Sequence, residues 1–244
     1  MISCKNCGHS YEGKYCPQCR QSADTERITW HEVFHHVWHA VFHADRGLLY
    51  TIKELLLRPG RTLKDYLDGK RISHFNPFLF LLIAGGITSF LFFSLHLQPP
   101  VREISLEQVE HVNATLAHKY FALVGIVFLL LLSLTDFFFY RKWRLLMSEL
   151  IVINTFQAAQ IMVLTIVSIP FLLLQETLTA GAEPQVEVRT IIKVLILVYL
   201  FVTRYQFYEA KGKFGLSLRI ALQLSLLVVM YEFAISRVIV MLIS

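Results

Sequence analysis

The four cysteines of the chain form two Cys-x2-Cys pairs close to the N-terminus. Cys4 and Cys7 make the first pair, and Cys16 and Cys19 follow after eight intervening residues. Each pair can aim two thiolates at one point, and two such turns give the closed four-sulfur shell that structural zinc prefers. A redox Cys-x-x-Cys motif normally lies in a βαβ unit, which is not predicted here. We therefore predict a zinc ribbon over residues 1–22, folded largely by its metal.

A second group of possible metal ligands follows at helical spacing. His35, His39 and His43 recur every four residues, and Asp45 comes two residues later. Imidazoles one turn apart can share a metal ion, and a carboxylate could complete or orient the shell. The alternatives are an interfacial helix whose polar face uses histidine, and a pH sensor. We favour the helix without metal, because we identify no ligands from other segments.

Polar residues inside the apolar segments are further candidates, because ionisable groups are costly in a bilayer. Glu232 lies about midway along the last segment, and Gln223 precedes it. Asn154, Gln157 and Gln160 recur at three-residue spacing and could meet Glu232 across a bundle. Such residues could form an ion relay or a polar cavity, or could simply hydrogen-bond neighbouring helices. We weigh the two equally for Glu232 and favour hydrogen bonding for the amides.

Asp136 is the other acidic residue of this kind. It lies beside Arg141 near the end of its segment. A carboxylate there can reach the headgroup region, so we expect an ordinary boundary charge.

Long apolar segments must position these side chains. Of the 244 residues, 55% are hydrophobic and only 17% are charged, which is far from the composition of soluble domains. Helices are the expected form, because backbone amides find no water in hydrocarbon. We predict an all-α membrane protein with a five-helix transmembrane bundle over residues 76–244. Five segments are long enough to span a bilayer: 77–97, 120–140, 150–174, 190–208 and 218–243.

Lysine and arginine set the expected orientation. Eleven lie before the first span, and Arg141, Lys142 and Arg144 lie between the second and third spans. Arg204 is counted with the connection after the fourth span. Positive charge favours the cytosolic side of short loops. We therefore expect the N-terminus in the cytosol and the C-terminus outside.

Residues 27–75 have the pattern of amphipathic juxtamembrane helices. An apolar stripe begins at Trp30, and further helices are expected over Leu48–Leu56 and 62–67, with a break at Arg58-Pro59-Gly60. Basic residues of this region should face anionic lipids of the inner leaflet. Nucleic-acid binding is the less favoured alternative.

Several of these motifs together resemble a known family. They are the Cys4 to Cys19 ribbon, the His35 to Asp45 stretch, Leu57-Arg58-Pro59-Gly60, and Gly69-Lys70-Arg71 leading to Asn76-Pro77-Phe78. Together they resemble the bacterial domain of unknown function 3667 over about the first 85 residues. Ribbons of this group often have glycine after the last cysteine, where this chain has Arg20. The resemblance implies a zinc-ribbon protein of the bacterial inner membrane and supplies no reaction.

Three functions remain open. The favoured one is a membrane-anchored interaction or regulatory protein whose ribbon recruits a protein partner. The second is a small transporter or channel that uses Glu232 and the amides of the third span, a function that assembly into a homo-oligomer would favour. The third is an intramembrane metalloenzyme built on the histidines. We favour a non-enzymatic role, because the sequence contains no serine elbow, phosphate loop or His-Glu-x-x-His motif.

Overall fold

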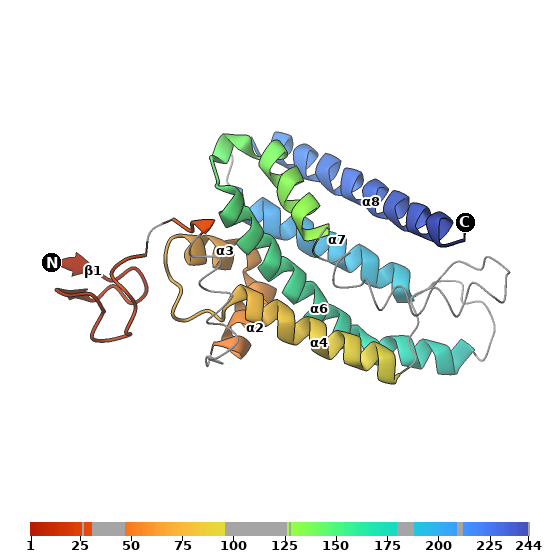
Figure 1. Cartoon of the computed structure of the whole chain (residues 1–244), viewed down its shortest axis with the longest axis horizontal. Coiled ribbons are helices and arrows are strands. Elements are labelled where there is room, and N and C mark those ends of the chain that lie inside the picture. Colours follow the sequence, from red (N-terminus) through yellow and green to blue (C-terminus); the bar gives the residue numbers. More distant parts are fainter. Residues whose placement is uncertain are drawn as a thin grey trace.

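A computed structural model describes residues 1–25, 27–30, 47–95, 126, 128–179, 188–208 and 212–243. Side chains at 176–179, 189 and 231–243 lie outside this description. The described chain is a small N-terminal ribbon followed by helices (Figure 1). The ribbon lies beside one end of the helices, which we call the ribbon end.

The ribbon is built from a short hairpin and two cysteine turns. Strand β1 (Ile2–Ser3) pairs antiparallel with β2 (Ser10–Tyr11). Each turn is closed by a backbone hydrogen bond: the Gly8 amide donates to the Cys4 carbonyl at 2.9 Å, and the Arg20 amide donates to the Cys16 carbonyl at 2.8 Å. These bonds hold each cysteine pair in a fixed turn.

Two short helices follow at the ribbon end. Helix α2 (Leu48–Leu57) ends at Arg58, whose extended φ of −141° breaks the helix, and α3 (Pro59–Leu67) begins at once. Proline suits the first helical position, where its missing amide hydrogen is not needed. The break lies where the sequence predicts it, but α3 begins three residues earlier than the predicted 62. Leu55, Leu63 and Tyr66 are buried in the core that α2 and α3 share with the long helices.

The long helices run side by side away from the ribbon end (Figure 1). Asn76 starts the first, because its side-chain oxygen accepts hydrogen bonds from the amides of Phe78 and Leu79. A shorter helix, Phe128–Phe139, leads into the one-turn helix η1 (Arg141–Trp143). The long helices are α4 (Pro77–Ser94), α6 (Met147–Thr179), α7 (Val188–Phe207) and α8 (Lys213–Ile243).

Within the described residues, four helices are long and apolar enough to cross a membrane. They correspond to the predicted spans 77–97, 150–174, 190–208 and 218–243. Helix α6 extends beyond both predicted ends, and α8 begins at Lys213, before the predicted 218. The predicted span 120–140 lies partly outside the described residues, so the count of five stays a prediction.

Gly60 is where α3 and α7 approach most closely. A Cβ atom there would lie 2.4 Å from Gln206 Cβ and 2.5 Å from the Phe207 amide nitrogen. The Gly60 amide also donates a hydrogen bond to Gln206 Oε1 at 3.2 Å. Only glycine permits this contact, which fixes α3 on the end of α7.

We expect Gly60→Ala to destabilise the protein by about 1–3 kcal/mol, the usual range for overpacking. Thermal unfolding of the detergent-purified protein, followed by tryptophan fluorescence, measures the change. Gly86→Ala is the matched control, because a Cβ there meets nothing within 4 Å. Equal melting temperatures for the two variants would contradict the close approach.

Candidate metal centre and buried polar cluster

The four cysteine thiols converge on one point in the ribbon. Their sulfur atoms all lie within 4.8 Å of one another, close enough to bind one metal ion together. Two of the sulfur pairs are 3.5 Å apart (Cys4 with Cys19) and 3.6 Å apart (Cys7 with Cys16). A tetrahedral zinc–sulfur shell with 2.3 Å bonds has sulfurs roughly 3.8 Å apart. The thiols therefore fit such an ion with only a small adjustment.

The thiols also perturb one another electrostatically. Burial raises the pKa of Cys4, but hydrogen bonds from the backbone of Cys7 and Asn6 and from neighbouring thiols outweigh it, so the pKa falls to about 7. A backbone hydrogen bond from His9 lowers the pKa of Cys7, whereas desolvation and the other thiols raise it to about 12. Four thiolates this close repel one another, so a bound cation would stabilise the fully ionised site.

Arg20 adopts an unusual backbone conformation after the last cysteine. Its φ is +64°, in the left-handed region that favours glycine. The second cysteine turn requires this geometry, because the Arg20 amide closes the turn by donating to the Cys16 carbonyl. The arginine is therefore a mildly strained substitute that leaves the metal ligands in place.

The ribbon is docked on the loop between α3 and α4. Gln21 is buried, and its side-chain oxygen accepts hydrogen bonds from the amides of Arg71 (3.2 Å) and Ile72 (3.3 Å). The Ser73 hydroxyl donates to Asn6 Oδ1 at 3.1 Å. Gly69 makes room for the ribbon, because a Cβ there would lie 2.8 Å from Lys5 Cδ. These contacts hold the metal centre next to the helices.

A second attachment joins the segment that follows the ribbon, at Arg27 and Ile28, to the start of α6. Arg27 donates two hydrogen bonds to the Glu149 carboxylate, at 2.9 Å and 2.6 Å, and a third to the Arg144 carbonyl. Glu149 is 4% exposed and also accepts from the Leu146 amide at the start of α6. The Ser148 hydroxyl donates to the Ile28 carbonyl at 2.6 Å. Two-pronged arginine–carboxylate pairs are geometrically specific, so this latch sets where the ribbon sits.

A buried ion pair lies between the long helices near the ribbon end. The Arg204 guanidinium on α7 is 3.3 Å from Asp136 on helix Phe128–Phe139, and each residue is 1% exposed. Arg204 also donates to Gln223 Oε1 (3.1 Å) and to Gln157 Oε1 (2.9 Å). One arginine therefore binds side chains from three other helices.

The amides complete this polar cluster, which we define by Asp136, Asn154, Gln157, Arg204 and Gln223. Asn154 donates to Asp136 at 2.9 Å, and Gln223 donates to the other oxygen of the same carboxylate. Gln157 Nε2 lies 3.5 Å from the oxygen of Asn154. The cluster saturates its charged groups, as a buried ion pair requires.

The predictions for two charged residues are wrong. Asp136 is not a boundary charge beside Arg141, and Arg204 does not belong to a loop. Both are buried, because they satisfy each other and the amides across the bundle. One feature of the sequence could have indicated this ion pair. Asp136 and Arg204 are 68 residues apart, carry opposite charges, and lie near the same end of two apolar segments.

The remaining predicted site residues have different positions. Gln160 is buried one turn beyond Gln157, and its Nε2 lies 3.5 Å from the Ile52 carbonyl of α2. The side chain of Glu232 lies outside the described residues, as do His35, His39, His43 and Asp45.

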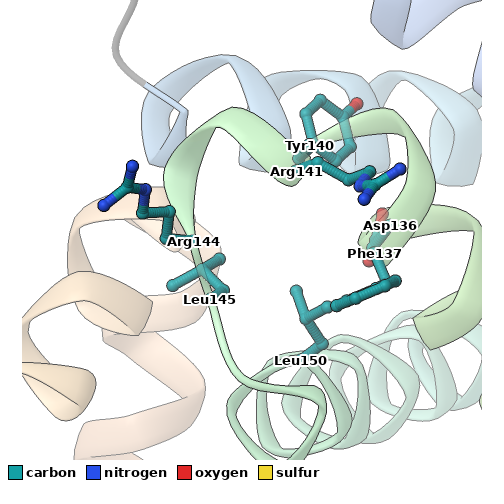
Figure 2. Close-up of a pocket in the computed structure, with 7 residues that line it drawn as sticks. All are labelled: Asp136, Phe137, Tyr140, Arg141, Arg144, Leu145 and Leu150. Atoms are coloured by element: carbon teal, nitrogen blue, oxygen red, sulfur yellow. The ribbon is translucent and has the colours of Figure 1, made fainter.

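A small cavity opens beside the polar cluster. It has a volume of about 210 Å³ and lies under the turn that joins helix Phe128–Phe139 to α6. Figure 2 shows Asp136 and Arg141 on one side of this turn and Arg144 pointing away on the other. Asp136 lines this cavity but is only 1% exposed, and its carboxylate is committed to Arg204 and the amides.

One comparison with known proteins finds a match. The model of the DUF3667 family, described as a protein of unknown function, matches residues 45–93. The matched segment covers α2, α3 and most of α4, and it confirms the resemblance to this family there. The chain matches no curated protein and no solved structure.

We expect Arg204→Gln and Asp136→Asn each to destabilise the protein by about 3–5 kcal/mol, because each leaves a buried charge without its partner. The double variant should lose less than the sum of the two. Thermal unfolding in detergent measures the coupling between them. Lys53→Gln, at an exposed position of α2, is the control and should change the stability little. If the effects of the changes at positions 136 and 204 were additive, the ion pair between them would be contradicted.

The metal centre should lose its ion as the pH falls, because protons compete with the metal for the thiolates. We expect one ion per chain to survive dialysis against chelator at about pH 7.5 and to be lost at about pH 5. Elemental analysis of the purified protein measures this. Cys19→Ser should lose the ion at both pH values, whereas His9→Gln, beside Cys7 in the sequence, should retain it at the higher pH. A second ion per chain would support the predicted site at the histidines.

Proposed function

We propose that this protein is a membrane-embedded scaffold that holds a zinc ribbon at the cytosolic surface and presents it to a protein partner. The observation that carries the proposal is the docking of the ribbon through Gln21 and Arg27. A ribbon joined only by a flexible linker would not need these contacts.

The metal chemistry supports a structural role for the ion. Four thiol ligands would fill the tetrahedral shell of zinc and leave no position open for a substrate. Zinc is the ion that this donor set and geometry favour. The ribbon is too small to bury a core of its own, so the ion would supply most of its folding free energy.

Exposed apolar side chains of the ribbon support partner binding. Tyr15 is 66% exposed, and Ile2 on the hairpin is 44% exposed. Tyrosine is enriched where proteins bind one another. A fixed ribbon would present these side chains at low entropic cost, because their positions are set before the partner arrives.

The basic residues support the proposed orientation. Arg61, Arg141, Arg144 and Arg219 all lie at or near the ribbon end of the helices. Positive charge next to spans favours the cytosolic side. We infer that the ribbon faces the cytosol, which in a bacterium makes the membrane the inner one.

The polar cluster gives transport little support. The amides Asn154, Gln157 and Gln223 are engaged with Asp136 and Arg204 and lie 0–2% exposed. Side chains held in this way clamp helices and do not line an open pathway.

A photo-crosslinking amino acid at Tyr15 tests the proposal in intact cells. We expect one discrete adduct with another protein. The adduct should be lost in a Cys16→Ser background, because the ribbon would no longer fold. The same probe at Tyr50, exposed on α2 at the same end, is the matched control and should give no such adduct. The proposal would be wrong if the adduct persisted in the Cys16→Ser background, or if the probe at Tyr15 gave no adduct.

A further inference from the structure

A groove lies between the end of helix Phe128–Phe139 with η1 on one side and the first turns of α8 on the other. Its volume is about 710 Å³. Phe138 and Phe139 line one wall, and Leu218 and Leu222 on α8 line the other. Phe138, Leu218 and Leu222 are each more than half exposed, so the groove opens to the surroundings of the bundle.

Three cations gather in the same groove. Arg141 and Lys142 come from η1, and Arg219 comes from α8. All three are exposed, and no acidic residue lines the groove. Among the described residues, none of the three has an acidic partner within ion-pair distance. The groove therefore has a strong positive charge that the described chain leaves unneutralised.

The position of Arg219 is set by an aromatic neighbour. Its guanidinium carbon lies 6.0 Å from the centre of the Trp143 ring, at cation–π distance. Trp143 in turn packs edge-on against Tyr140 and Tyr208. The cation is thus held at the groove by packed aromatic rings, and it needs no new ordering to meet an anion.

We propose that this groove binds one phospholipid with an anionic headgroup. The phosphate lies among Arg141, Lys142 and Arg219, and an acyl chain runs along the apolar walls. Basic pockets between transmembrane helices bind phosphate headgroups in this way. The groove is shallow and open to its surroundings, as suits a lipid whose headgroup and upper acyl chain lie along the surface of the bundle.

Charge complementarity selects a lipid over other occupants. A soluble anion would satisfy the cations but would leave the apolar walls uncovered. A second copy of the same surface would bring three more cations into the groove, which repel the first three. A phospholipid can contact both the cations and the apolar walls, because its anionic headgroup and its acyl chains belong to one molecule.

Gly215 provides a way to block the groove without touching its charges. It lines the groove near the start of α8, and a Cβ atom there meets nothing within 4 Å. Leucine at this position fills open space without clashing with the protein. Leucine is also a better helix former than glycine, so the change should not unfold α8.

The experiment titrates the full-length protein in neutral detergent with phosphatidylglycerol or phosphatidylcholine and counts bound lipids by native mass spectrometry. We expect one phosphatidylglycerol to bind at least tenfold more tightly than phosphatidylcholine. Lys142→Gln with Arg219→Gln should weaken phosphatidylglycerol by about 25-fold, roughly fivefold for each cation removed. Gly215→Leu should weaken both lipids.

Matched controls separate the groove from general charge effects. Lys53→Gln with Arg61→Gln removes two exposed cations from α2 and α3 and should leave binding unchanged. Gly86→Leu adds the same side chain to α4, again in open space, and should also leave it unchanged. Elution volume on a sizing column verifies that each variant remains folded.

Four results of the lipid titration would overturn the proposal. They are equal binding of the two lipids, equal losses in the two double variants, normal binding by Gly215→Leu, and displacement of phosphatidylglycerol by millimolar inorganic phosphate. The last would assign the cations to a soluble anion. A lipid-free dimer that the Lys142 and Arg219 changes dissociate would instead assign the groove to a second copy, and would likewise overturn it.

Discussion

The buried pair of Arg204 and Asp136 is the constraint on which the bundle depends. Neither charge is stable alone among apolar helices, so each must be brought to the other and supplied with further hydrogen bonds. Those bonds come from Asn154 and Gln157 on α6 and from Gln223 on α8. Packing between apolar helices in lipid has little directional preference. The pair therefore specifies which faces of four helices meet, and at what depth.

The same end of the bundle organises the ribbon. Glu149 begins α6 and binds Arg27, while the loop before α4 binds Gln21. Glu149, which holds the ribbon, thus lies on the same helix as Asn154 and Gln157, which help to hold the helices together. Loss of the ion would unfold a unit that contacts α6 and the loop before α4. The metal would therefore contribute to the order of this whole end, beyond the ribbon itself.

Much of this organisation is predictable from the sequence, because it depends on the spacing and type of residues that are close together in the chain. The cysteine spacing indicates the ribbon, and the length of the apolar segments indicates the four long helices. Arg204 and Asp136 are misjudged for a physical reason: hydropathy weighs each charge against lipid and ignores a partner 68 residues away. The docking residues Asn6 and Gln21 are ordinary in the sequence. Their role depends on which loop folds next to them, which no periodic pattern encodes.

The separation between Arg27 and Glu149 has a consequence for biosynthesis. The two residues are 122 positions apart, and the ribbon leaves the ribosome first. The ribbon can therefore take up its ion while its docking site on α6 does not yet exist. Its first attachment, to the loop before α4, can form once residues 71–73 have been made, whereas the second must wait for the start of α6. The N-terminal unit is therefore placed in two steps, first on the loop before α4 and then, through Arg27 and Glu149, on the third predicted span.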